Sequence, residues 1–281
     1  MNQGKRRSTS VGARPPVESG GAQPRPSVTA RALSILEAFS AANPRLSLAQ
    51  ITSRCGLPHT TAFRLTNELV EWGALVRQDD GAYCIGLRLW EIGTLAPQSV
   101  PLRELAMPTM EDLYVAINQH IQLAVRQGTE AVVIERISAP KAIGLMSGVG
   151  GRLPLHASAA GQVLLAHADQ ELIEGVINGP LRSYTPTTIT DSTQLRAALA
   201  HCRRAGVAIV RGDLTRDAQS VATRITDSRG DVIAALSVVV EAGSASVPSI
   251  IPAVVTAGLN VSRRIRESGR RAIPERAGGP S

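Results

Sequence analysis

The chain has 281 residues, of which 43% are hydrophobic, and a net charge of +7. This length allows two domains, and no apolar stretch is long enough to cross a bilayer as a helix, which excludes a membrane-embedded protein. The three cysteines are widely separated and lack the spacing of metal ligands or of a disulfide scaffold. The polar N-terminal region has no apolar segment typical of a signal peptide. We therefore expect a cytoplasmic protein without a metal or other cofactor.

The positive charge is concentrated at the two ends of the chain. Residues 1–27 contain five basic residues and one acidic residue, and residues 262–281 contain six and two. Residues 28–92 contain six of each and are neutral overall. Because the ends are rich in Pro, Gly, Ser and Arg, we expect disordered tails over 1–27 and 269–281. The N-terminal tail could follow DNA phosphates or could simply keep the chain soluble, and the sequence leaves both interpretations open.

The first ordered region, residues 28–87, has the pattern of a helix-turn-helix. A helix is predicted over 29–42, a second over 44–55 and a third over 58–72. Ser47 and Gln50, three residues apart, form a capping box in the second of these helices. We therefore expect three packed helices that share one small apolar core.

The turn and the following hairpin extend this pattern. Gly56 is suited to end a helix in the left-handed conformation, and Pro58 is suited to the first position of the next helix. Strands are predicted over 74–78 and 82–85, on either side of the hairpin dipeptide Asp80-Gly81. Helix, turn, helix and hairpin in this order predict a winged helix-turn-helix, which places its second helix in a DNA major groove.

The predicted recognition helix has an outer face that suits DNA. Arg64 can bind a guanine edge, Asn67 can bind adenine, and Phe63 can contact a thymine methyl group. A helix face that is merely solvated has a similar composition, but the adjoining cap, turn and hairpin favour the DNA reader. The predicted DNA contacts are His59, Thr60, Thr61, Phe63, Arg64 and Asn67.

The rest of the chain alternates between helical and strand periodicity. Helices are predicted over 87–96 and 102–118, with a break or kink near Pro108. Beyond these, strands are predicted over 120–126, 131–137, 143–147, 207–213, 221–226 and 232–240, and helices over 157–168, 169–178, 192–205 and 248–266. Strands before and after a block of helices predict an α+β domain with a mostly antiparallel sheet covered by helices.

Two other classes of protein, a serine–lysine enzyme and an architectural DNA binder, share single features with this sequence. Ser138 and Lys141 match the spacing of a serine–lysine enzyme, but the flanking strand pattern and Pro140 favour a loop where that chemistry requires a helix. A purely architectural DNA binder would leave the second domain without a role. We expect a protein that is not an enzyme.

Three stretches resemble the IclR family of bacterial transcription regulators. They are LPHTTAFRL at Leu57–Leu65, GRLPLHASAAG at Gly151–Gly161, and the segment Gly206–Val240. The resemblance implies a winged helix-turn-helix domain over 28–87, a linker helix over 88–107 and a GAF-like effector-binding domain over 108–268. Family members are homodimers, often paired as homotetramers, that bind double-stranded operator DNA and small organic-acid or aromatic effectors. The resemblance therefore implies a repressor or activator whose operator affinity is controlled by such an effector.

The resemblance also implies an effector pocket, whose contacts would be Met146, Gly148, Val149, Gly150, Asp213, Ser220 and Ser237. Glycine-rich backbone can direct amides toward an anion, and the two serines can donate hydrogen bonds. His156 is expected to bond backbone rather than ligand. The sequence departs from the family at Asp213, which is usually Glu, at Arg224, which replaces Pro, and at Val239, which replaces a serine. These changes favour a carboxylate with an apolar or aromatic body.

Overall fold

The computed structural model describes residues 26–40, 42–96, 100–140, 148–243 and 247–271. The chain divides into two compact units, residues 1–90 and residues 91–281. Each unit is described by itself below. No helix within the described residues is long and apolar enough to cross a membrane.

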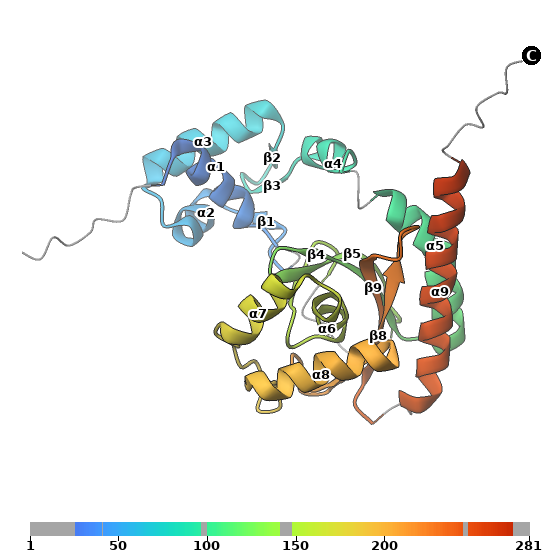
Figure 1. Cartoon of the computed structure of the whole chain (residues 1–281). Coiled ribbons are helices and arrows are strands. Elements are labelled where there is room, and N and C mark those ends of the chain that lie inside the picture. Colours follow the sequence, from blue (N-terminus) through green and yellow to red (C-terminus); the bar gives the residue numbers. More distant parts are fainter. Residues whose placement is uncertain (1–25, 41, 97–99, 141–147, 244–246, 272–281) are drawn as a thin grey trace, which may run out of the picture. The chain divides into compact units, whose positions relative to one another are not determined.

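The N-terminal unit is a winged helix-turn-helix (Figure 1). Its helices are α1 (Val28–Glu37), α2 (Leu48–Cys55), α3 (His59–Trp72) and α4 (Leu87–Gly93). Its antiparallel sheet has the strand order β1 (Arg45–Leu46), β3 (Tyr83–Ile85) and β2 (Leu75–Arg77). The buried core lies between the helices α1, α2 and α3 and the sheet. It consists of Ile35, Leu46, Ile51, Leu65, Leu75 and Tyr83.

The local signals that define this unit are present in the structure. The amide of Gln50 donates to Ser47 Oγ at 3.3 Å, and the Gln50 side chain accepts from the amide of Ser47 at 2.8 Å, which confirms the capping box. Gly56 ends α2 with a φ of 62°, and Gly73 ends α3 with a φ of 88°. Since only glycine adopts such angles without strain, these two positions set the lengths of both helices.

Three element boundaries differ from the sequence prediction. Helix α1 ends at Glu37 instead of residue 42. The second helix begins at Leu48 instead of residue 44, because Arg45 and Leu46 pair with β3 as a short strand. Pro58 is the N-cap of α3 with a ψ of 140°, so it precedes the helix instead of occupying its first position.

The C-terminal unit contains a six-stranded antiparallel sheet in the order β6-β5-β4-β9-β8-β7. The strands are β4 (His120–Gln127), β5 (Glu130–Ile137), β6 (Arg152–Pro154), β7 (Val207–Arg211), β8 (Ala218–Thr226) and β9 (Val232–Glu241). The helices are α5 (Val100–Ile117), α6 (Ala159–Ala166), α7 (Gln170–Asn178), α8 (Ser192–Ala205) and α9 (Val247–Arg271). This confirms the predicted α+β class.

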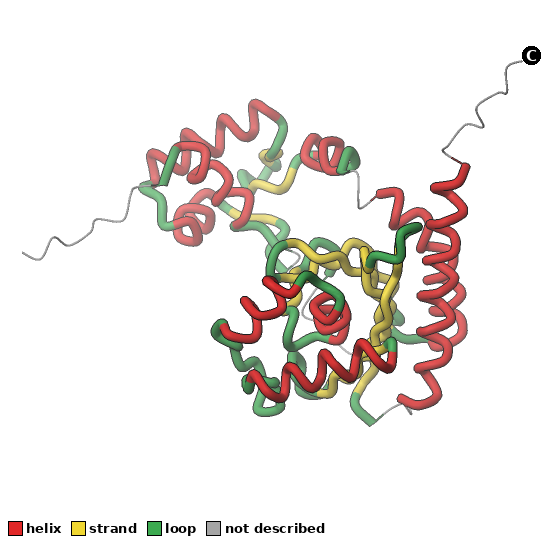
Figure 2. Tube along the Cα trace, viewed as in Figure 1, coloured by secondary structure: helices red, strands yellow, loops and turns green. Residues whose placement is uncertain are grey.

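Helices cover both faces of this sheet (Figures 1 and 2). Helices α5 and α9 pack on one face, over a core that includes Met110, Leu123 and Leu236. Helices α6, α7 and α8 pack on the other, over a core that includes Val133 and Leu165. Successive residues of a strand point to opposite faces, so each central strand contributes to both cores.

Several predicted segments of this half of the chain differ in extent. The predicted linker helix over 88–107 corresponds to parts of α4 and α5, and its boundary at 107/108 lies inside α5. Leu102 is buried in the core of the C-terminal unit, and α5 continues through Pro108. The predicted strand over 143–147 lies outside the described residues, and β6 was not predicted because it has only three residues.

The predicted tails are shortened at their inner ends. Ser27, which was assigned to the N-terminal tail, accepts a hydrogen bond from the amide of Ala30 and caps α1. Helix α9 extends to Arg271, three residues into the predicted C-terminal tail over 269–281. Residues 1–25 and 272–281 lie outside the described part of the chain.

We expect Gly86→Ala to destabilise the N-terminal unit. A Cβ at Gly86 would lie 2.1 Å from the carbonyl oxygen of Gly73, and overpacking of this kind costs about 1–3 kcal/mol. Both tryptophans, Trp72 and Trp90, lie in this unit, so urea unfolding followed by tryptophan fluorescence reports on it. Gly93→Ala is the matched control, since a Cβ there meets nothing within 4 Å. Equal midpoints for both variants would contradict the close approach.

Candidate functional site

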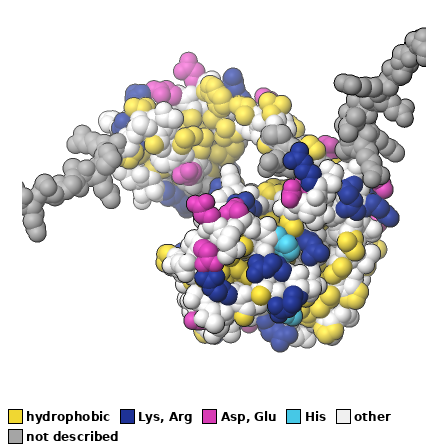
Figure 3. Space-filling model, in the orientation of Figure 1, with side chains coloured by type: hydrophobic (Ala, Val, Ile, Leu, Met, Phe, Trp, Pro, Cys, Tyr) yellow, Lys and Arg dark blue, Asp and Glu magenta, His cyan; other side chains and the backbone are white. Residues whose placement is uncertain are grey.

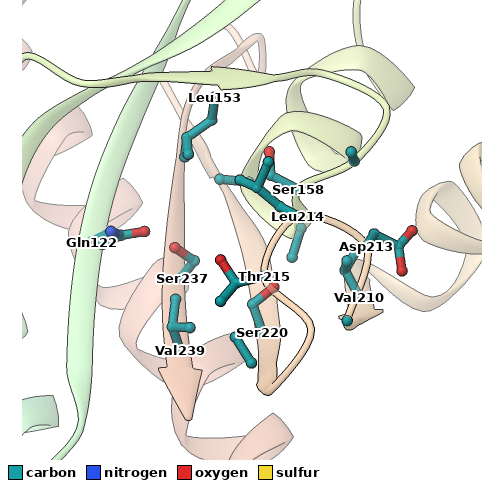
Figure 4. A pocket seen from close by; sticks show the side chains of 15 residues that line it. Gln122, Leu153, Ser158, Val210, Asp213, Leu214, Thr215, Ser220, Ser237 and Val239 are labelled. Carbon is teal, nitrogen blue, oxygen red and sulfur yellow. The ribbon is translucent and has the colours of Figure 1, made fainter. Parts of the chain in front are cut away.

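A cavity lies between the sheet of the C-terminal unit and the start of α6 (Figure 4). Its volume is about 60 Å³, several times the 10–15 Å³ that one water molecule needs. The apolar part of the described wall includes Leu153, Val210, Leu214 and Val239. The polar part comprises Gln122, Ser158, Asp213, Thr215, Ser220 and Ser237. A cavity with a largely apolar lining and a few polar groups is typical of a small-molecule site.

Ser237 is the polar group that most clearly requires a ligand. It lies on β9, is 2% exposed and lines the cavity, and its Oγ has no hydrogen-bond partner. A buried hydroxyl without a partner is costly, because burial has removed the water that would otherwise bond it. Gln122 lies opposite Ser237 in the β4–β9 register and directs its amide to the same space (Figure 4).

The N-terminus of α6 forms a second polar edge of the cavity. Residues 157–160 line the cavity, and Ser158 caps the helix by accepting from the amide of Gly161 at 3.1 Å. The amides of Ala159 and Ala160 belong to the first helical turn, for which the helix itself offers no acceptor. Such a terminus favours a carboxylate or phosphate. The described wall contains no Lys or Arg side chain, so these dipoles are the groups there that can attract an anion.

The last glycine of the Gly151–Gly161 stretch has a structural explanation. A Cβ on Gly161 would lie 2.6 Å from the carbonyl oxygen of Pro154 and 2.7 Å from the Cα of Leu155. The helix can therefore approach the end of β6 at this point only because residue 161 has no side chain. This close approach holds the α6 N-terminus against the cavity.

Asp213 lines the cavity but directs its carboxylate away from Ser237 and Thr215 (Figure 4). Burial raises the pKa of the Asp213 carboxyl, and this effect exceeds the lowering by the backbone N–H groups of Ile189 and Arg211 and by nearby His156. Thr188 donates its hydroxyl to the Asp213 carbonyl at 2.6 Å. Asp213 therefore links the cavity wall to the segment before α8 through hydrogen bonds, and its carboxylate does not point toward Ser237 and Thr215.

The predicted glycine-loop residues that the structure describes do not line this cavity. Gly148, Val149 and Gly150 are absent from its described wall, and Val149 is 59% exposed. The Gly150 amide donates to the carbonyl of Val133 at 2.7 Å, which extends the sheet edge instead of facing an anion. Met146 lies outside the described residues.

The structure thus brings together three of the seven proposed effector residues, Asp213, Ser220 and Ser237. Gln122, Ser158 and Thr215 join them and were not proposed from the sequence. Gln122 had a detectable signal, a polar residue between the apolar Ile121 and Leu123 of the predicted strand. His156 Nε2 lies 3.0 Å from the carbonyl oxygen of Arg182, as expected of a histidine that bonds backbone.

The outward face of α3 carries the residues proposed for DNA contact. His59, Thr60, Phe63, Arg64 and Asn67 are exposed, and Thr61 is half-buried. Phe63 is 47% exposed, which is unusual for an aromatic side chain without a partner. Arg64 forms an ion pair with Glu68 one turn later. This surface pair is worth at most about 1 kcal/mol, so a guanine edge can compete for Arg64.

The wing adds two basic residues that were not proposed from the sequence. Arg45 on β1 pairs with Asp80 at the hairpin turn, with its nitrogen 2.7 Å from the carboxylate. Arg77 on β2 lies over the ring of Tyr83, 5.9 Å from its centroid. A wing with exposed arginine suits the DNA backbone beside the major groove.

Helix α4 has an unusually apolar surface. None of its residues is buried, and Leu87 and Trp90 are 67% and 64% exposed. Hydrophobic side chains are continuous over this part of the N-terminal unit in Figure 3. Exposed apolar patches of this kind mark contact sites for other macromolecules.

The serine–lysine alternative has no assembled site in the described residues. Ser138 and Pro140 follow β5 outside any helix, and Lys141 lies outside the described part of the chain. No group of three or more His, Cys, Asp or Glu side chains comes together there as a metal site.

Both halves of the chain match models of known domains. The IclR helix-turn-helix domain matches residues 28–80, and the bacterial transcriptional regulator IclR C-terminal domain matches residues 94–263. The regulator KipR of Bacillus subtilis (strain 168) is 30% identical over 226 residues, which cover 79% of this chain and 90% of KipR. The repressor AllR of Escherichia coli (strain K12) is 30% identical over 236 residues, which cover 83% of this chain and 85% of AllR.

Solved structures agree with these matches. An IclR homolog from Microbacterium hydrocarbonoxydans, complexed with 4-hydroxybenzoate, is 36% identical with a TM-score of 0.81. The likeness covers 86% of this chain and 100% of that chain. The relatives are regulators of transcription, not enzymes.

Proposed function

The chain belongs to the IclR family of bacterial transcriptional regulators, and we propose that a small organic acid controls its affinity for operator DNA. The acid binds in the cavity beside α6 and has a carboxylate and an apolar or aromatic body. Helix α3 and the wing bind the operator, and the protein acts as a homodimer in the cytoplasm. The observation that carries the effector proposal is the unpartnered hydroxyl of Ser237 in that cavity.

The lining supports an acid of limited polarity. The α6 N-terminus and the hydroxyls of Ser220, Ser237 and Thr215 can hold a carboxylate, while Leu153 and Val239 face the remainder of the ligand. The homologue from Microbacterium hydrocarbonoxydans binds 4-hydroxybenzoate, which has this chemistry. The four-residue set Met146, Gly148, Val149 and Gly150 is not needed for this proposal.

Control of DNA binding follows from linkage. A ligand that binds two conformations of the protein unequally shifts the population toward the one it prefers. If these conformations differ in operator affinity, the ligand changes that affinity, and DNA changes ligand affinity by the same factor. The linked parts are the cavity and α3, which lie in different units of the chain.

The charge and surface of the winged helix-turn-helix support the proposal of a dimer. With six basic and six acidic residues over 28–92, this region of one copy has little net attraction for phosphates. Two linked copies gain affinity because the second contact is intramolecular. The exposed apolar face of α4 is the surface that we assign to the pairing of two N-terminal units.

We expect Ser237→Ala to lower effector affinity about tenfold or more, because a hydrogen bond to a charged group contributes about 1.5–3 kcal/mol. Isothermal titration calorimetry with 4-hydroxybenzoate and benzoate measures this, and glyoxylate serves as the compact polar comparison. Without ligand, the same change should leave the free energy of unfolding unchanged or raised, because it removes an unsatisfied buried group. Ser192→Ala, at an exposed serine of α8, is the control. Binding by wild type that persists undiminished in Ser237→Ala would remove Ser237 from the site.

We expect Arg64→Ala to weaken specific operator binding by about 1–3 kcal/mol and to relax the base preference at one position. Glu68→Gln should not weaken binding, since it releases Arg64 and removes a negative charge from the DNA-facing helix. Footprinting and binding titrations at fixed salt measure both. Arg229→Ala, at an exposed turn of the other unit, is the control. Unchanged affinity and unchanged sequence preference in Arg64→Ala would exclude Arg64 as a base reader.

We expect Leu87→Ala combined with Trp90→Ala to weaken pairing of the N-terminal units. Binding to a palindromic operator should then fall, while the weaker binding to a single half-site stays unchanged, because α3 is intact. Electrophoretic mobility shifts on full and half operators measure the difference. Ile209→Ala, at a 40% exposed residue of β7, is the control. Equal loss on both operators would show that α4 supports the fold of the reader and not its pairing.

A further inference from the structure

A groove lies between the last turn of α7 and the β6 edge of the sheet. Its described wall comes from residues 129–130, 154–156, 175–176, 179–182 and 184. Its volume is about 310 Å³, within the range of about 300–1,000 Å³ that is typical of ligand sites. Among the described residues, this wall shares none with the cavity beside α6. A ligand bound in the groove would therefore occupy a separate site.

Tyr184 supplies the groove with an aromatic ring, and the residue is 37% exposed. The guanidinium of Arg182 lies over this ring, 5.2 Å from its centroid. The ring of His156 lies on the same tyrosine with the two centroids 6.0 Å apart. Both separations are in the range of favourable cation–π and aromatic contacts. The tyrosine ring is therefore held by two neighbours, while part of it stays accessible to a ligand.

Hydrogen bonds hold the segment that carries Tyr184. The Tyr184 amide donates to Thr188 Oγ1 at 3.0 Å, and that hydroxyl donates to the carbonyl of Asp213 at 2.6 Å. On the other side, His156 Nε2 lies 3.0 Å from the carbonyl oxygen of Arg182. The aromatic wall is thus fixed without a ligand, which reduces the entropy that a ligand loses on binding.

The charges of the groove wall favour an anion. Arg182 is exposed and forms no ion pair within the described residues. The carboxylate of the wall, Glu130, is already paired, since its Oε2 lies 2.9 Å from Arg152 Nη1. Arg182 is therefore the charged group of this wall that is open to a ligand. A guanidinium binds a carboxylate through two parallel hydrogen bonds.

The end of α7 offers hydrogen-bond acceptors to the same groove. Gly175 and Val176 line it and belong to the last four residues of α7, whose carbonyl groups have no N–H partner within the helix. A ligand hydroxyl can donate to such a carbonyl. The wall also includes Leu155 and Leu181, which present apolar surface.

We propose that this groove is a second ligand site, for an aromatic carboxylic acid that carries a hydroxyl group. The carboxylate pairs with Arg182, the ring packs on Tyr184, and the hydroxyl donates to the end of α7. A peptide strand added to the sheet at β6 fits less well, because β6 has three residues and one of them, Pro154, has no N–H to donate. The site goes beyond the proposed function, because it lies outside the effector cavity.

Equilibrium dialysis of the full-length protein with radiolabelled 4-hydroxybenzoate tests this. We expect the wild type to bind one molecule in the cavity and a second in the groove. Arg182→Gln should weaken the groove step about tenfold or more, since it removes a charged hydrogen-bond partner. Tyr184→Leu should weaken the same step about threefold or more, and Tyr184→Phe should not, because the ring remains. 4-Hydroxycyclohexanecarboxylate, which has no aromatic ring, should bind the groove more weakly.

The matched control is Arg204→Gln, at an exposed arginine of α8, which should retain both steps. Unchanged binding in Arg182→Gln and Tyr184→Leu would overturn the proposal, as would an equal loss in Arg204→Gln. If Tyr184→Leu does not melt cooperatively, the exposed Arg182→Gln decides the outcome.

Ser237→Ala separates this proposal from the proposed function. It should weaken the cavity step and leave the groove step unchanged. A single bound molecule that only Ser237→Ala weakens would overturn the second site and support the effector cavity. A single bound molecule that only Arg182→Gln and Tyr184→Leu weaken would support the groove and count against the effector cavity.

Discussion

Burial of the six-stranded sheet on both faces is the constraint on which the C-terminal unit depends. Along β9, Leu236 and Val238 face the core under α5 and α9, while Ser237 and Val239 face the cavity. A sheet covered on both faces usually has apolar strands throughout. A hydroxyl placed in such a strand needs a partner that solvent cannot supply. The chain itself supplies no hydrogen-bond partner for the Ser237 hydroxyl, so the cavity favours a ligand with a polar group there.

The same sheet joins the cavity to the helices on its opposite side. On β4, Gln122 faces the cavity and the next residue, Leu123, packs in the core under α5. The ion pair between Arg103 and Glu135 adds a polar tie between α5 and β5. Because protein interiors are close-packed, a ligand that shifts β4 also shifts the contacts of α5. Helix α5 is the first helix that lies wholly in the C-terminal unit, and we therefore propose it as the element that links ligand binding to the DNA reader.

Signals between neighbouring residues were readable from the sequence, and contacts between distant segments were not. The capping box of Ser47 and Gln50 and the left-handed Gly56 depend on adjacent residues, and the structure has both. Strand β1 escaped prediction because its partner β3 lies nearly forty residues away and the pairing has only two residues. The orientation of Asp213 depends on Thr188 and Ile189, 25 and 24 residues earlier in the chain. The presence of Asp213 in the pocket could therefore be inferred from the family resemblance, but not the direction of its side chain.

Because the described wall of the cavity has no basic side chain, the proposed recognition of an acid has a consequence for selectivity. A helix terminus and hydroxyl dipoles attract any small carboxylate to a similar extent, since they contact the group that all such acids share. Discrimination must then come from the apolar part of the wall, which includes Leu153, Val210 and Val239. Apolar pockets separate ligands that differ by a methylene group by about 1–3 kcal/mol. In the proposed site, the replacement of a family serine by Val239 changes the apolar wall that selects among acids, while Ser237 remains available to bind the carboxylate that they share.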